Sequence, residues 1–248
     1  MPALYSRHLP SRRCSSTLSR NFLVLSALNL AFLAGCAHPG PQDPARTGPF
    51  YTPTNYSGDA NLGEIRRVVV MPLWAGRTAS VESAASLDPI ILAALQASQR
   101  FEVVSLSRED ILRRFRAESF SSAAELPHDL MTALQREFEA DAVLLVDLTV
   151  YRPHRPLALG FRAKLATLDS ARLIWTFDNL FSAEDASVAN AARNHFLDLD
   201  QRIPADLTHS ALQSPSRFAA YVSAAMFATL PPVAFKPGAA TVPAQKTR

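Results

Sequence analysis

The feature that most constrains this fold is an almost unbroken apolar run at residues 142–151, AVLLVDLTVY. Its first half is entirely apolar, so both faces of a strand formed here must be covered by other parts of the protein. Its second half alternates and places Asp147 and Thr149 on one face. The run therefore predicts a central strand of a sheet that is covered by helices.

Strand and helix patterns alternate on either side of this run. Residues 67–73 read as a second buried strand, ended by Pro72 because proline cannot donate to a sheet ladder. Residues 157–168 and 173–181 alternate apolar and polar side chains around a turn at 169–172, which predicts an antiparallel hairpin. The remaining predicted elements are a strand at 101–106 and helices at 88–99, from Ser107, at 127–138, at 183–197 and at 214–230.

These elements predict an α/β (α+β) fold with a single three-layer-like domain over residues 64–231. We expect a mixed sheet of about five strands that ends in an antiparallel hairpin, with helices packed on the sheet. Asp88 is expected to cap the first helix, with Pro89 in its first turn. Residues 232–248 have few side chains that pack, which predicts a disordered tail.

A basic leader precedes the domain. The first 21 residues carry four arginines and no acidic residue, and an apolar run follows at 22–33, FLVLSALNLAFL. This run is too short to cross a hydrocarbon core of about 30 Å, which needs roughly 20 helical residues. A basic segment, a short apolar segment and small residues at a cleavage point are typical of a secretory signal, here 1–35.

The apolar run ends in Leu33, Ala34, Gly35 and Cys36, which together resemble a bacterial lipobox. The resemblance implies cleavage before Cys36, diacylation of its thiol and acylation of the new amine, for example by palmitate. Two or more acyl chains give stable anchoring in a lipid bilayer. Ala37, in place of an aspartate, implies transport to the outer membrane with the domain in the periplasm. The alternatives are an ordinary signal peptide and a cytosolic protein with an apolar arm.

Removal of the leader changes the charge of the protein. The whole chain has 25 basic and 22 acidic residues, whereas the chain from Cys36 onward has 21 and 22, a net charge of −1. The composition therefore gives no support for nucleic-acid binding. Cys14 lies in the leader and Cys36 would be acylated, so no disulfide is expected. Residues 36–63, rich in proline and glycine, predict a flexible spacer that holds the domain clear of the membrane.

No catalytic set, cofactor site or metal site is predicted. The histidines after the leader lack the spacing of metal ligands, and no G-x-S-x-G motif is present. Glycine is scarce from residue 75 onward, which argues against a phosphate-binding loop. Asp147 is either a buried acid near a pocket or, as we favour, a solvated group or ion-pair partner of Arg162 or Lys164.

Three further features have two interpretations each. Arg162 and Lys164 form either a basic strip for an anionic partner or, as we favour, a solvated sheet face. Trp175 is expected in the core rather than as a ligand-stacking residue. Arg113 and its neighbours Arg114 and Arg116 are expected on the solvated side of an amphipathic helix, where Glu109 can pair with Arg113.

The segments VVVMPL, FEVVSLSREDI, ADAVLLVDLTVY and LATLDSARLIW carry a family resemblance. Their order, over residues 65–182, resembles the periplasmic domain of the curli secretion-channel (CsgG-like) lipoproteins. It is also similar to the N-terminal domain of TolB and to lipoprotein activators of penicillin-binding proteins. The resemblance implies a small domain that binds other envelope proteins and is not an enzyme.

We therefore predict an outer-membrane lipoprotein that acts as a non-catalytic protein-binding or assembly module of the cell envelope. Its expected partners are the lipid bilayer, through Cys36, and an envelope protein. One alternative is a subunit of an export channel, and another is an enzyme acting on cell-wall or polysaccharide material. Channel-forming members of the family insert extra hairpins between the central strands, whereas here the connection spans only 152–156.

Overall fold

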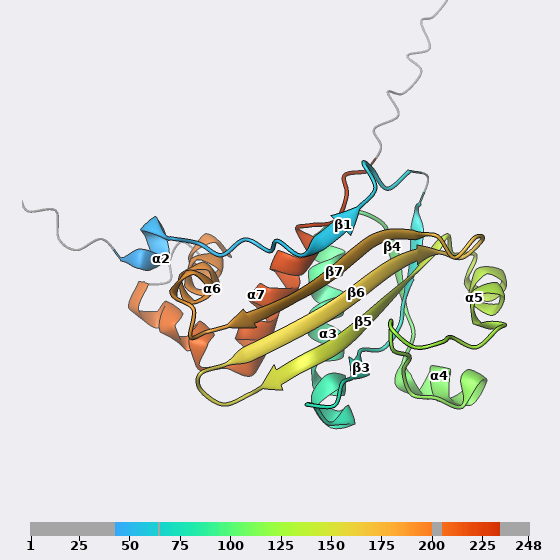
Figure 1. The fold of residues 1–248 in the computed structure, drawn as a ribbon, viewed down its shortest axis with the longest axis horizontal. Helices are drawn as coiled ribbons and strands as arrows, with labels where there is room; N and C mark the ends of the chain where they lie inside the picture. The colour runs from blue at the N-terminus through green and yellow to red at the C-terminus, as the bar shows by residue number, and fades with distance from the viewer. Residues whose placement is uncertain (1–42, 64, 200–204, 234–248) are drawn as a thin grey trace, which may run out of the picture. The chain divides into compact units, whose positions relative to one another are not determined.

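A mixed sheet forms the framework of the domain in the computed structural model, which describes residues 43–63, 65–199 and 205–233 (Figure 1). Its seven strands run in the order β1-β7-β6-β5-β2-β4, with β3 pairing on β5. The α+β fold expected from the sequence is therefore confirmed. The strands are β1 (Tyr56–Gly58), β2 (Arg67–Val70), β3 (Trp74–Ala75), β4 (Glu102–Ser105), β5 (Ala142–Arg152), β6 (Ala158–Thr167) and β7 (Leu173–Ser182).

Helices connect and cover these strands. In the part of the chain that the structure describes, the α-helices are α2 (Pro44–Thr47), α3 (Val81–Ala97), α4 (Arg108–Phe115), α5 (Leu130–Phe138), α6 (Ala186–Leu199) and α7 (Pro215–Phe227), and a 3₁₀ helix, η1, spans Ala205–Leu212. None of the helices in the described ranges is both long and apolar enough to cross a membrane.

The predicted central strand is β5. It pairs antiparallel with β6, and β6 pairs antiparallel with β7 across the turn at 168–172, so the predicted hairpin is confirmed. On its other side β5 pairs parallel with β2, and β2 pairs parallel with β4. The sheet is therefore antiparallel on one side of β5 and parallel on the other.

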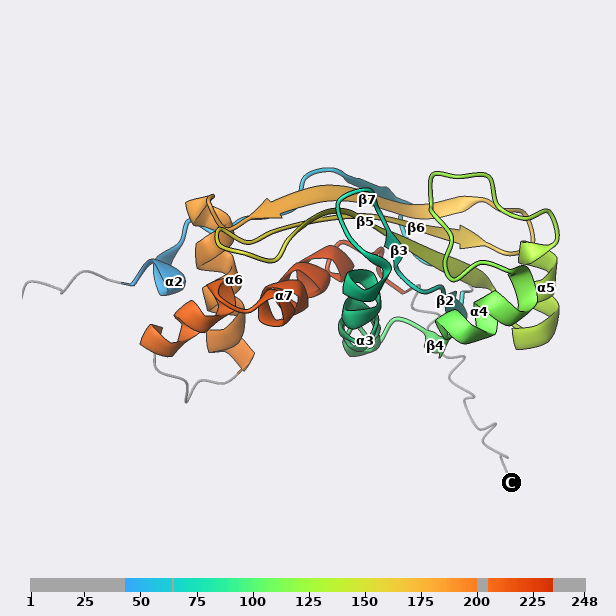
Figure 2. The same ribbon diagram turned by 90° about the horizontal axis from the view of Figure 1, so that it is seen from below.

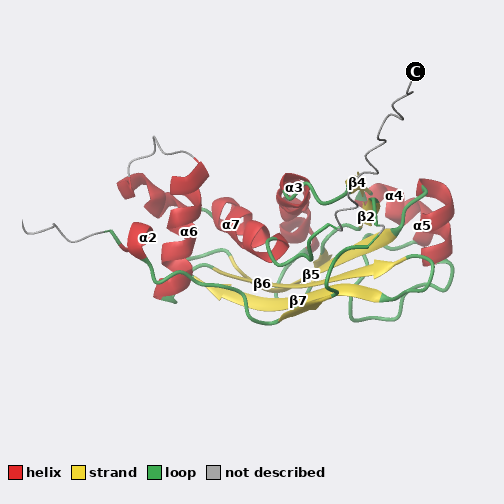
Figure 3. Ribbon diagram, turned by 90° about the horizontal axis from the view of Figure 1, so that it is seen from above, coloured by secondary structure: helices red, strands yellow, loops and turns green. Residues whose placement is uncertain are grey.

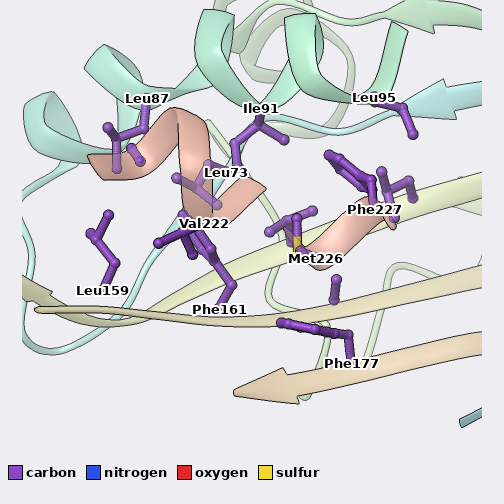
Figure 4. Close-up of a cluster of buried hydrophobic side chains, with 14 of the residues drawn as sticks. Leu73, Leu87, Ile91, Leu95, Leu159, Phe161, Phe177, Val222, Met226 and Phe227 are labelled. Atoms are coloured by element: carbon purple, nitrogen blue, oxygen red, sulfur yellow. The ribbon is translucent and has the colours of Figure 1, made fainter. Parts of the chain in front are cut away.

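The larger core lies on one face of the sheet, under α3 and α7. Figure 2 shows α3, α6 and α7 on the same side of β5, β6 and β7. Apolar residues of α3 and α7 meet the even-numbered apolar residues of β5 and the odd-numbered ones of β6. The close-up in Figure 4 shows this contact, with Ile91 of α3, Val222 and Met226 of α7, and Phe161 and Phe177 of the sheet.

The opposite face carries a smaller core. The odd-numbered residues Val143 and Leu145 of β5 pack there with Ile111 of α4 and with Leu130 and Leu134 of α5. Because α3 and α4 lie on opposite faces, the chain leaves β2 toward one face and leaves β4 toward the other. Connections that diverge in this way open a crevice at the carboxyl ends of parallel strands.

The start of α3 differs from the prediction. The helix begins at Val81, where the Ser80 side chain accepts a hydrogen bond from the Ser83 amide, and Asp88 and Pro89 lie in its interior. The predicted start at Asp88 is therefore wrong, because Ser80 supplies an earlier cap. The interior proline costs the helix one backbone hydrogen bond. Burial of a long apolar stripe offsets this loss, and its residues are Ala84, Leu87, Ile91 and Leu95.

The segment before β2 is packed against the domain, so the predicted flexible spacer is wrong for residues 43–63. Asp43 caps the short helix α2, and Arg193 of α6 donates to Asp43 at 2.7 Å. Figure 3 shows α2 beside α6. The Tyr51 amide donates to the Ser187 carbonyl at 3.1 Å, and β1 then pairs with β7. We call residues 43–58 the strap. Residues 36–42 and the predicted tail at 234–248 lie outside the described residues.

Candidate functional site

The best-formed candidate site is the crevice at the carboxyl ends of β2 and β4. It has a volume of about 410 Å³ and opens between α3 and the start of α4. In open α/β sheets this position, where the strand order reverses, is the common place for a ligand. Its apolar walls come from the end of β2, from α3, from the end of β4 and from β5, through Val70, Leu73, Ile91, Leu92, Leu106 and Val146.

One ion pair forms the polar part of the crevice. Arg108, the first residue of α4, donates from Nε to Asp88 Oδ2 at 2.9 Å and from Nη2 to Asp88 Oδ1 at 3.1 Å. Nη2 also donates to the Leu73 carbonyl at 2.7 Å. The two side chains are 15% and 30% exposed. The remaining nitrogen, Arg108 Nη1, is buried and has no acceptor among the residues that the structure describes.

The carboxylate of Asp88 is fully engaged. Its Oδ1 also accepts from the Leu73 amide at 2.8 Å, so both oxygens hold donors from the protein. Burial raises the pKa of the Asp88 carboxyl, while the Leu73 amide and the Arg108 charge act in the opposite direction. A general base needs a lone pair directed at the proton that it removes. The crevice is therefore equipped to bind apolar groups and one acceptor atom rather than to transfer a proton.

The sequence did not reveal this crevice. Its residues come from four separate segments, and Asp88 and Arg108 are 20 positions apart. The pattern did locate the start of α4 at Ser107, whose side chain accepts from the Asp110 amide, whereas β2 ends at Val70, before the predicted end at Pro72. The missing signal was the role of Asp88, because an aspartate before a proline is typical of a helix start.

Asp147 is buried, with 1% of its surface exposed, and it binds a loop. Ser121 Oγ and Ser122 Oγ donate to its Oδ2 at 2.9 and 3.0 Å, and the Ser122 amide donates to Oδ1 at 2.7 Å. The favoured prediction, a solvated group or an ion pair with Arg162 or Lys164, is therefore wrong. The polar connection after α4 folds over the sheet face that carries Asp147 and satisfies its carboxylate. These hydrogen bonds to Asp147 hold the loop against the sheet.

The two basic residues of β6 do not form a continuous strip. Arg162 Nε donates to Asp178 of β7 at 2.8 Å, and both side chains remain more than a third exposed. Lys164 Nζ donates to the Ser122 carbonyl at 2.7 Å and so helps to hold the same loop. Arg162 therefore lies on a partly solvated sheet face, as the favoured interpretation expected, and its ion pair is with Asp178 rather than with Asp147.

The remaining residues that the sequence analysis singled out lie in the core or in ion pairs on helices. Trp175 is fully buried, stacks on Phe177 and donates from Nε1 to Thr229 Oγ1 at 3.1 Å, which confirms its place in the core. Arg113 pairs with Glu109 at 3.7 Å, as predicted, and also with Asp110. Arg114 pairs with Glu137 of α5.

The predicted acylation site lies outside the described residues. Cys36 and the three lipobox residues Leu33, Ala34 and Gly35 precede Asp43, where the description begins. Their role therefore stays a prediction. Within the described ranges, no three His, Cys, Asp or Glu side chains gather as a set of metal ligands.

The chain matches no protein-family model and no curated protein. It has distant structural similarity to the PelC dodecamer from Paraburkholderia phytofirmans, with 14% identity over 71% of this chain and 94% of that one and a TM-score of 0.39. Lipoprotein GNA1162 from Neisseria meningitidis matches with 13% identity over 55% and 96% and a TM-score of 0.37. The LpoB C-terminal domain from Escherichia coli matches with 16% identity over 46% and 81% and a TM-score of 0.33.

A TolB structure from Acinetobacter baumannii also matches, with 10% identity over 59% of this chain and 31% of that one and a TM-score of 0.29. The chain thus has distant structural similarity to several bacterial proteins, one of them named as a lipoprotein. No functional residue is transferred from proteins at this distance.

Proposed function

We propose that this chain is a lipoprotein, anchored in the outer membrane through acylated Cys36, whose periplasmic domain binds another envelope protein without catalysing a reaction. The observation that carries the binding role is the composition of the crevice. Its walls are apolar and one buried guanidinium nitrogen, Arg108 Nη1, has no acceptor among the described residues, whereas both oxygens of Asp88 are occupied. Apolar pockets with a few placed polar groups are typical of binding sites.

The strap supports a position close to the bilayer. Only six residues separate Cys36 from Asp43, the first residue that the structure describes. Even a fully extended chain advances about 3.3–3.6 Å per residue, so this connection reaches at most about 25 Å. An anchored Cys36 would therefore hold the α2 end of the domain near the membrane surface. This geometry replaces the long spacer that the proline content suggested.

Acylation is tested by replacing each of the two cysteines. We expect that wild type and the control variant Cys14→Ser incorporate an alkyne-tagged palmitate and sediment with outer membranes. We expect Cys36→Ser to do neither, because this variant lacks the thiol that would carry the lipid and Cys14 lies outside the lipobox. Retention of Cys36→Ser in the outer membrane, or its labelling with palmitate, would refute the lipid anchor.

Binding is tested by photo-crosslinking in living cells. A benzoylphenylalanine is placed at Leu92, which lines the crevice, or at Leu112, which is exposed on α4 outside the crevice. A third position is Leu180, exposed on β7. We expect a discrete protein adduct that depends on position and is lost in the Cys36→Ser background. The absence of a protein adduct from all three positions would overturn the binding role.

A further inference from the structure

The guanidinium of Arg108 is fixed in place before any ligand arrives. Three hydrogen bonds, to Asp88 and to the Leu73 carbonyl, use Nε and Nη2. They hold the planar group in one orientation and leave Nη1 without an acceptor among the residues that the structure describes. A buried donor without an acceptor carries a desolvation cost that a ligand oxygen would remove. The crevice therefore favours a ligand that has a hydrogen-bond acceptor at one defined point.

The charge around this donor favours a neutral acceptor. Asp88 already balances the Arg108 charge at 2.9 Å and lines the crevice itself. A phosphate or a carboxylate that accepted from Arg108 would lie close to the Asp88 carboxylate and would be repelled. An amide carbonyl accepts a hydrogen bond without that repulsion. The surrounding walls are apolar, so the acceptor should be flanked by apolar groups.

The edge of the sheet favours an extended ligand. β4 is the last strand in the sheet order, and no described segment pairs with its outer edge. Its end, from Ser105 to Ser107, forms part of the crevice wall. A free strand edge binds extended peptides through main-chain hydrogen bonds, while pockets beside it select side chains.

From these three observations we propose that the crevice binds an extended apolar peptide segment of the protein partner. A large apolar side chain of the segment fills the cavity between Leu92 and Leu106, and a neighbouring main-chain carbonyl accepts from Arg108 Nη1. The segment continues along the outer edge of β4. This proposal deepens the proposed function and rests on it, since it names the part of the partner that the domain holds.

The test uses the purified full-length lipoprotein in detergent micelles and a phage-displayed library of random linear peptides. We expect the selected peptides to share a large apolar residue with neutral neighbours. The tightest of them is then synthesised with a fluorophore, and its affinity is measured by anisotropy. Selection of peptides whose common feature is acidic residues or a free carboxylate would contradict the charge argument.

Two matched pairs of variants locate the binding site. Leu92→Ser removes a wall of the crevice and should weaken binding of the selected peptide about tenfold, whereas Leu112→Ser, on the outside of α4, should not. Arg108→Lys keeps the charge but removes Nη1, and Arg114→Lys is its control on the same helix. Urea midpoints confirm that each variant is folded. Equal affinities within both pairs would overturn the proposal.

A final comparison separates the partner from the protein's own tail. Deletion of residues 234–248 should leave the peptide affinity unchanged. Binding that occurs only after this deletion would identify the tail as the occupant and would overturn the proposal. Crosslinks at Leu112 or Leu180 without any peptide binding at the crevice would refute this inference alone. Peptide binding without any adduct in cells would instead refute the proposed function.

Discussion

Two aspartate–arginine pairs in this domain have similar chemistry and different surroundings. Asp43 and Arg193 join the strap to α6, across 150 positions of sequence. Asp88 and Arg108 join α3 to α4 at the crevice. Both arginines are largely buried, with 8% and 15% of their side chains exposed. The same two kinds of charged group therefore hold the strap in one place and line the crevice in the other.

The pair at the strap connects segments of the chain. Arg193 donates to Asp43 at 2.7 Å and to Thr208 Oγ1 at 3.1 Å. A hydrogen bond from the Ala45 amide lowers the pKa of Asp43, and Arg193 adds to this effect. At the crevice, burial raises the pKa of Asp88, and Arg108 Nη1 has no acceptor within the described ranges. The strap pair completes the fold, whereas the crevice pair leaves one polar contact for a ligand.

The largest effect on stability is expected for Arg193→Met. The substitution leaves Asp43 and Thr208 without their buried donor, so the strap should detach from α6. Breaking a buried pair by removing one partner costs about 3 kcal/mol. The measurement is the free energy of unfolding in urea, with Arg172→Met as control because its pair with Asp59 is about half exposed. The control should lose less than about 1 kcal/mol. Equal losses would mean that the strap pair is not structural.

The sequence predicted those elements whose signal is local. The run at 142–151 is apolar on both faces, and the alternation around 169–172 defines a hairpin, so the fold class followed from them. The strap also carried a local signal that proline content obscured. Asp43 and Pro44 form a helix cap and first turn, with Gly48 at the other end.

The roles of buried polar groups were not predictable from local patterns. Asp147 is satisfied by Ser121 and Ser122, which lie in a polar connection without periodicity. Asp88 is satisfied by Leu73 and Arg108, which lie 15 and 20 positions away and belong to other segments of the fold. In both cases the pairing depends on which loop folds over which strand end. A single sequence shows that such an acid needs partners, but it does not show which residues they are.

A smaller loss of stability is expected for Arg108→Met. The Asp88 side chain is 30% exposed, so water can replace some of the hydrogen bonds that Arg108 donates to it. In addition, Arg108 Nη1 has no hydrogen bond to a described residue that the substitution would remove. We expect a cost of about 2 kcal/mol in urea unfolding. The double variant Asp88→Asn with Arg108→Met should recover part of it, because no unpaired charge remains. A loss for Arg108→Met as large as that for Arg193→Met would remove the distinction between the two pairs.

The smallest effect, about 1 kcal/mol for each variant, is a pH dependence of opposite sign for Asp43→Asn and Asp88→Asn. The pKa of Asp43 is lowered in the folded protein, so its contribution is present at neutral pH and is lost as the pH falls below about 4. The pKa of Asp88 is raised, so ionisation favours the unfolded chain. The stability of wild type relative to Asp88→Asn should therefore be greatest in acid and should decline as the pH rises.

Urea unfolding of wild type and both variants across the acidic range measures these two slopes. Each variant removes one titrating carboxyl, so subtraction from wild type cancels the groups that they share. Hydrogen bonds lower the pKa of Asp43, whereas burial at the crevice raises the pKa of Asp88. The difference in unfolding free energy between wild type and each variant must therefore change with pH in opposite directions. Slopes of the same sign would show that burial does not dominate at Asp88, and the crevice would then be as polar as the strap.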